Sequence, residues 1–147
     1  MKGAVILEYL IVIAVMAILV LIVSSGFTSF RESAHLNEAD IIISSMLRDA
    51  QSRTLSSEKN IQYGVHFEGA QVVLFAGNSY NSSASSNEPN VLPTLTRISS
   101  INLGGPVDVV FTRLTGAASA SGTITIESIS NSSKLRIITI LSSGNIE

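Results

Sequence analysis

The chain contains no cysteine, and only three of its 147 residues are proline. Without cysteine, no disulfide can hold the fold and no thiol chemistry is available. Charged residues make up only 14% of the chain and the net charge is −2, which does not favour a nucleic-acid-binding protein that works through bulk positive charge. The length allows one domain beside the apolar segment at the start of the chain.

Histidine is also scarce, and its two positions do not indicate catalysis. His35 lies three residues from both Glu32 and Glu38, a helical spacing that can place all three on one face. Neither a second histidine nor a cysteine joins them, so a zinc site lacks donors. His66 alternates with apolar residues along a predicted strand, and we expect it to face solvent. There is no Gly-x-Ser-x-Gly nucleophile motif. We therefore expect no enzyme, no metal site and no cofactor.

A long apolar run follows the first three residues. Ala4 to Val23 is 20 residues with a single charge, Glu8. About 20 apolar residues cross the hydrocarbon core of a bilayer, roughly 30 Å, as one helix. An acid inside such a span costs on the order of 2.5–3.5 kcal/mol on insertion scales. Because of this cost we interpret Glu8 as a functional residue with a partner.

The combination of Gly3, Ala4 and Glu8 with the apolar run resembles the start of type IV pilins and of the pseudopilins of type II secretion. In that family a peptidase cuts after the glycine of a short basic leader, and glutamate is the fifth mature residue. The resemblance implies a leader of residues 1–3, cleavage before Ala4, N-methylation of Ala4 and a role for Glu8 in assembly. The chain departs from the commonest pattern, which has phenylalanine first and an aliphatic residue where Tyr9 stands.

Two other interpretations of the run are a signal anchor and a cleaved secretory signal with small residues at Ser24–Gly26. Glu8 argues against both, because neither gains from a carboxylate inside the membrane. Lys2 precedes the run, and a mixed pair, Arg31 and Glu32, follows it. The positive-inside rule therefore favours a cytoplasmic N-terminus, which agrees with the cytoplasmic action of the family's peptidase.

The helix is predicted to continue well beyond the apolar run, from Ala4 to about Ser57. No glycine occurs between Gly26 and Gly64. Apolar or small residues recur at spacings of three and four, which is typical of an amphipathic helix that packs on a sheet. This stripe comprises Phe27, Phe30, Leu36, Ala39, Ile43, Met46 or Leu47, Ala50 and Thr54.

Gly26 follows two serines, and Gly/Ser pairs are common kink sites, so any bend in the helix should centre on Gly26. For the isolated subunit we favour a straight helix that tolerates this one glycine. We divide the chain into a leader (1–3), a transmembrane helix (4–25), an amphipathic helix that continues the span (26–58) and an extracytoplasmic headpiece (59–147).

The headpiece is predicted to be a mostly antiparallel β-sheet, because apolar residues alternate with a period of two after Ile61. Residues 77–90 form a long loop rich in serine and asparagine, with no apolar pattern. The predicted fold class is α+β, with a long N-terminal helix packed on this sheet. The predicted strands are 61–67, 71–76, 96–103, 107–111, 123–129 and 135–141.

The headpiece also resembles, more loosely, the GspH/FimT group of minor pseudopilins. The matching positions are Val107–Phe111, Gly116, Gly122–Ile124, Arg136–Ile138 and Gly144. Some FimT-like pilins bind DNA through basic residues near their C-terminus. Here no basic residue follows Lys134 and Arg136, and acidic residues outnumber basic residues after Ile61. Nucleic-acid binding is therefore not favoured.

The resemblance implies a structural subunit, a minor pilin or pseudopilin. Its expected partners are other pilin subunits, the prepilin peptidase and the inner-membrane assembly platform. It would be a single-pass inner-membrane protein before assembly and part of a pilus or pseudopilus afterwards, a choice between two systems that the residues leave open. The alternatives are a DNA- or surface-binding minor pilin and a single-span protein that does not polymerise.

Overall fold

The computed structural model describes the backbone of residues 2–147 and the side chains of residues 6–22 and 27–147. The chain divides into two compact units, residues 1–34 and 35–147. Helix α1 (Lys2–Leu55) supplies residues to both, and a short 3-10 helix (Glu58–Asn60) follows it. The predicted long helix is confirmed, with each end displaced by two residues.

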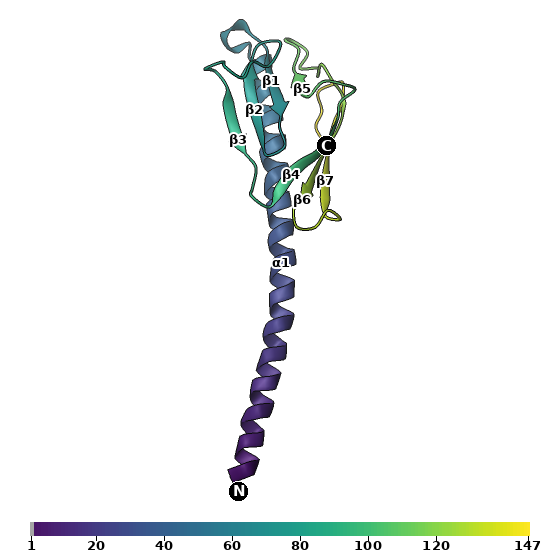
Figure 1. Ribbon diagram of the computed structural model, residues 1–147. Helices are drawn as coiled ribbons and strands as arrows, with labels where there is room; N and C mark the ends of the chain where they lie inside the picture. Colours follow the sequence, from purple (N-terminus) through teal and green to yellow (C-terminus); the bar gives the residue numbers. More distant parts are fainter. Residues whose placement is uncertain (1) are drawn as a thin grey trace. The chain divides into compact units, whose positions relative to one another are not determined.

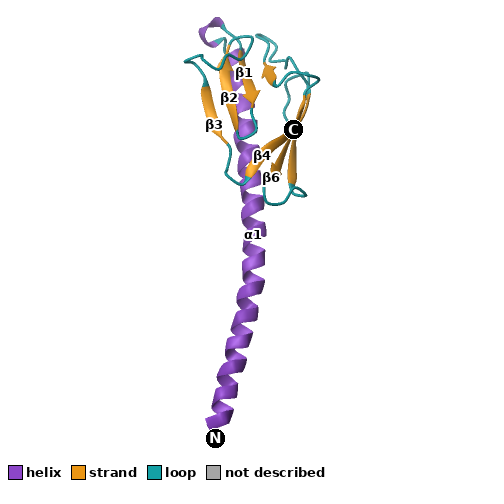
Figure 2. Ribbon diagram, viewed as in Figure 1, coloured by secondary structure: helices purple, strands orange, loops and turns teal. Residues whose placement is uncertain are grey.

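Seven strands follow α1 and form two antiparallel sheets within the second unit (Figures 1 and 2). One sheet has the order β3-β2-β1-β5 and the other the order β4-β6-β7. The α+β class is confirmed, but the headpiece has two sheets where the sequence predicted one. The strands are β1 (Tyr63–Phe67), β2 (Gln71–Ala76), β3 (Glu88–Val91), β4 (Thr96–Asn102), β5 (Asp108–Val110), β6 (Gly122–Ser128) and β7 (Leu135–Ile140).

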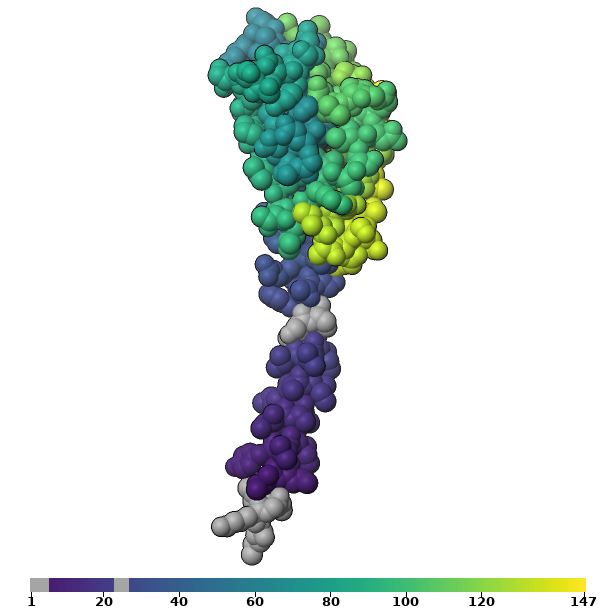
Figure 3. Space-filling view, viewed as in Figure 1, coloured from purple at the N-terminus to yellow at the C-terminus, as the bar shows by residue number. Residues whose placement is uncertain are grey.

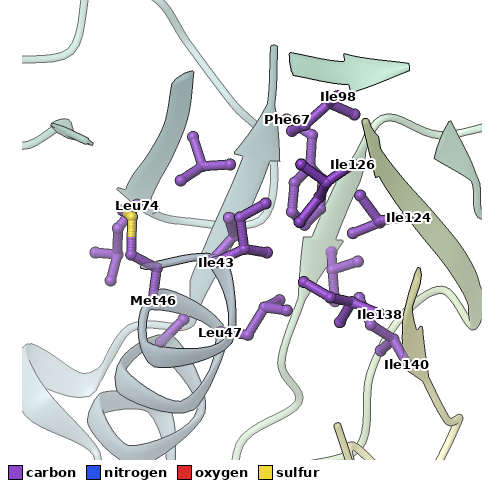
Figure 4. Packing of buried hydrophobic residues seen from close by; sticks show 14 of the residues in the cluster. Ile43, Met46, Leu47, Phe67, Leu74, Ile98, Ile124, Ile126, Ile138 and Ile140 are labelled. Carbon is purple, nitrogen blue, oxygen red and sulfur yellow. The ribbon is translucent and has the colours of Figure 1, made fainter. Parts of the chain in front are cut away.

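The core of the second unit lies between α1 and both sheets. The predicted stripe supplies the helical side of this core from Leu36 onward, and Ile43 and Leu47 are fully buried there. Phe27 and Phe30, which were predicted to belong to the stripe, are instead exposed. Figure 4 shows Ile43 and Leu47 facing isoleucines of β6 and β7, while Met46 lies beside Leu74 of β2. Fully burying one such aliphatic side chain contributes about 1.5–3 kcal/mol, so α1 is part of the core and not an appendage to it.

Strand β3 was missed by the sequence analysis, which placed its first residues inside a loop. Pro89 and the exposure of all four residues explain the omission, because proline within a strand and a lack of apolar alternation both argue against one. β3 pairs with β2 through Glu88↔Leu74 and Gln71↔Val91 at the edge of the sheet. An edge strand tolerates proline, since one side of its backbone has no ladder to join.

The loops at one end of the headpiece are joined to α1 by Gln51. Its side-chain amide donates to the carbonyl oxygens of Gly116 and Gly144, at 2.9 and 3.1 Å. Both glycines have positive φ angles, +67° and +90°, which glycine adopts without strain. These are two of the positions on which the GspH/FimT resemblance rests, and the structure gives each a local physical role.

Candidate assembly site

Glu8 lies in the first unit, on α1, with its side chain exposed. Its neighbours Leu7 and Tyr9 are also exposed, at 61% and 67%. Among the described residues, none forms an ion pair with Glu8. The proposed processing residues Gly3 and Ala4, and the candidate kink residue Gly26, lie outside the residues whose side chains are described.

Every described side chain from Ile6 to Ile22 is exposed. In water this would form an apolar surface far larger than the few hundred Å² that soluble monomers expose. The helix is long and apolar enough to cross a membrane, judged by length and composition. Such a surface requires an apolar cover, either lipid or the corresponding surfaces of other helices.

The C-terminal end of α1 is attached to the edge strand β3 by an ion-pair network. Arg53 lies 2.6 Å from Glu88 of β3 and 2.8 Å from Asp49, one turn earlier on α1. Hydrogen bonds to Glu88 and then to Asp49 raise the pKa of the Arg53 guanidinium. The guanidinium also lies 5.8 Å from the centre of the Tyr63 ring. Arg53 therefore joins the helix to both β3 and β1.

Thr54 completes this attachment from inside the core. Its side chain is fully buried, and its hydroxyl donates to the Ala50 carbonyl at 2.8 Å. The same hydroxyl oxygen accepts from the Tyr63 backbone N–H at 2.9 Å. The helix thus provides the acceptor for this backbone donor of β1. From the sequence alone, Thr54 was predicted only to belong to the apolar stripe.

The outer face of the first sheet carries a polar cluster that the sequence analysis missed. His66 contacts the Asp108 carboxylate through Nδ1, and its Nε2 lies 3.7 Å from Glu68. The Tyr80 ring stacks on the imidazole, with centroids 3.9 Å apart and planes inclined by 10°. Desolvation raises the pKa of the Tyr80 phenol, and the Glu68 carboxylate adds to this effect.

The expectation that His66 faces solvent is therefore wrong, since its side chain is only 15% exposed. Part of the loop 77–90, which has no apolar pattern, covers His66, and its Tyr80 also meets the Phe75 ring edge-on at 5.7 Å. A sequence signal for this burial exists in β2. Val72 to Phe75 are consecutive buried residues, and an unbroken apolar strand is typical of a sheet covered on both faces.

Neither histidine belongs to a recognisable metal centre. Within the described part of the chain, no three His, Cys, Asp or Glu side chains are grouped so as to hold a metal ion. His35 lies 3.5 Å from Glu38, as the helical spacing predicts. That pair is a partly exposed contact on α1, with side chains 27% and 60% exposed, of the kind that contributes little to stability.

The basic residues of the headpiece do not form a continuous stripe. Arg97 of β4 pairs with Glu127 of β6, and Arg113 donates to the backbone and side chain of Asn60. Lys134 directly precedes β7, and Arg136 is the second residue of that strand. Since a nucleic-acid site usually requires clustered bases, this arrangement does not favour one.

No family model, curated protein or solved structure matches the chain. The resemblance to pilins therefore rests on the residues that carry it, and the function has to be argued from the geometry of the two units.

Proposed function

We propose that the protein is a structural subunit that is processed at Gly3 and assembled into a filament of the type IV pilus or type II secretion pseudopilus kind. One observation carries this proposal. The exposed apolar part of α1 contains a single acid, Glu8, while the other end of the same helix forms the core of a β headpiece. A headpiece that includes the end of its own membrane helix suits a subunit whose helix packs in a filament.

The assembly mechanism follows from the exposed apolar surface of residues 6–22. When the helix leaves the bilayer, this surface is covered again by the helices of neighbouring subunits, at about 25 cal/mol per Å² buried away from water. Apolar surfaces alone can slide past one another. Glu8 sets the axial register by pairing with the freed amine of Ala4 on the preceding subunit, a use of a buried ion pair that does not require a large net stabilisation.

Processing provides the first test. With the prepilin peptidase present, mass spectrometry of the membrane-extracted protein is expected to find a chain that begins at Ala4, with its amine methylated. Gly3→Val should leave the precursor intact, because the peptidase requires a residue without a side chain at this position. An intact N-terminus in the wild-type protein would instead favour an anchored protein that never polymerises.

The role of Glu8 provides the second test. Glu8→Gln keeps the shape of the side chain and removes its charge, so the protein should insert and be cleaved but enter filaments poorly. The measurement is an immunoblot of sheared filaments against total cell protein. Glu38→Gln is the matched control, since it removes the same charge from an exposed position of α1 in the second unit. Equal incorporation of all three proteins would show that Glu8 is merely tolerated.

A further inference from the structure

The two sheets of the headpiece have four edge strands, and at three of these edges a backbone contact or a proline limits the addition of another strand. Strand β5 is covered because Val110 donates to the Ser119 hydroxyl and accepts from the Ser119 backbone. At the edge of β4, the Ile98 N–H donates to the carbonyl of Gly69 in the β1–β2 turn, at 2.9 Å. At the edge of β3, proline at position 89 removes a donor, which is a recognised device against unwanted strand pairing.

The fourth edge, along β7, is closed for only half its length. Thr139 exchanges two backbone hydrogen bonds with Glu147, at 2.7 and 2.9 Å, and Leu141 donates to Asn145. Alternate residues of an antiparallel strand face opposite neighbours. Leu135 and Ile137 therefore direct their backbone groups to the same open side as Thr139, and no described residue hydrogen-bonds to these groups.

The side chains on this open half are also poorly covered. Leu135 is 48% exposed and Ile137 is 55% exposed. Arg136 lies between them, exposed, and forms no ion pair with any described residue. The segment that leads into β7 lies on the surface of the headpiece in the space-filling view (Figure 3, yellow). An exposed edge that combines free backbone groups with apolar side chains is a template for an added strand.

The charges on the open half of β7 limit which kind of strand can pair with it. If two copies of the edge paired with Leu135 opposite Ile137, Arg136 of one chain would lie directly opposite Arg136 of the other. A register with Leu135 opposite Leu135 would place Lys134 opposite Arg136. Like charges directly opposite on paired strands are destabilising, so a second copy of this edge is a poor occupant.

We propose that the open half of β7, residues 135–137, is a docking edge for an extended acidic segment of a different protein. The segment adds as an antiparallel strand, with its backbone bonded to Leu135 and Ile137. Its acids lie near Arg136 and Lys134, and its apolar residues at alternating positions cover the two exposed aliphatic side chains. This role is independent of processing and filament assembly, because it needs only the folded headpiece.

The test uses the full chain in detergent micelles and an extended peptide of about eight residues in which glutamate and valine alternate. Binding should slow amide hydrogen exchange at Leu135 and Ile137, whose N–H groups become bonded, and leave the exchange at Thr139 unchanged. The comparison peptide has lysine in place of glutamate and should bind about tenfold more weakly.

Two variants locate the site. Ile137→Pro removes an outward donor, as Pro89 does on β3, and should abolish the protection at Leu135. Arg136→Glu alters only an exposed side chain and should reverse the preference, with the lysine peptide now bound about tenfold more tightly than the glutamate peptide. Arg48→Glu, the same charge change at an exposed position of α1, should leave binding unchanged.

Three outcomes would overturn the proposal. They are unchanged exchange at Leu135 and Ile137 with the glutamate peptide, equal binding of the two peptides, and protection of both amides by self-association of the chain without any peptide. The last result would assign the edge to a second copy and not to an acidic partner.

Discussion

Gly144 lies where a side chain has no room. A Cβ atom on this residue would approach the Gly116 carbonyl oxygen to 2.1 Å, and its φ of +90° strains any other residue. Gly144→Ala is expected to destabilise the headpiece by about 2–4 kcal/mol. Urea unfolding followed by tyrosine fluorescence would measure the loss. Gly69→Ala is the control, since its Cβ would meet nothing within 4 Å, and a similar loss in both variants would contradict the argument.

Thr54 offers a second test at a single side chain. Thr54→Val keeps the volume but leaves the buried Tyr63 N–H without its acceptor, which should cost about 1–3 kcal/mol in the free energy of unfolding. Thr54→Ser retains the hydroxyl and should cost less than Thr54→Val. If the two variants unfolded at the same urea concentration, packing and not the hydrogen bond would explain the burial of Thr54.

At the scale of elements, the loop from Gly77 to Asn87 is held on the first sheet by a few ring contacts. Tyr80 supplies them, through stacking on His66 and an edge contact with Phe75. Aromatic pairs contribute about 0.5–1.5 kcal/mol beyond their buried area. Since the rest of the loop is mainly small polar residues, its attachment depends on this one ring.

Tyr80→Ala is therefore expected to release the loop without unfolding the sheet. Amide hydrogen exchange should become faster at Asn81–Asn87 and stay slow in β2 and β1, which retain their ladder. Tyr80→Phe keeps the ring and should behave like the wild type. Equal exchange in the alanine variant would mean that hydrogen bonds within the loop, such as Asn87 to Asn81, hold it unaided.

At the scale of the whole molecule, the two units are expected to differ in what they need from their surroundings. Residues 6–22 bury no side chain, whereas residues 35–147 share one core. A fragment that begins at Thr28 should be soluble and folded, with helix and strand in its circular dichroism spectrum. A fragment that begins at Ile61 should aggregate, because the faces that cover Ile43 and Leu47 become exposed. A stable monomer from the shorter fragment would show that α1 does not complete the core.

The sequence alone predicted the features that depend on local pattern. The length of α1, its apolar start and the buried stripe through Leu36 and Ile43 follow from the helical spacing of apolar residues. This spacing is a local property and does not depend on what the helix packs against. All six predicted strands follow β-branched runs or alternation, and the structure displaces their ends by no more than two residues at either side. Glu8 could be identified as a candidate functional residue because a charged residue within an apolar run is recognisable from the sequence alone.

Tertiary structure decided the features that join distant parts of the chain. No local pattern places Tyr80 on His66, or joins Gln51 to loops 65 and 93 residues later. Strand β3 exists because β2 offers it a ladder, although its own residues favour a loop. The division into two sheets, and the open half-edge at Leu135, depend on which backbone groups find partners. Packing determines these hydrogen-bond partners, because each buried polar backbone group needs a partner and the fold decides which group lies close enough to be that partner.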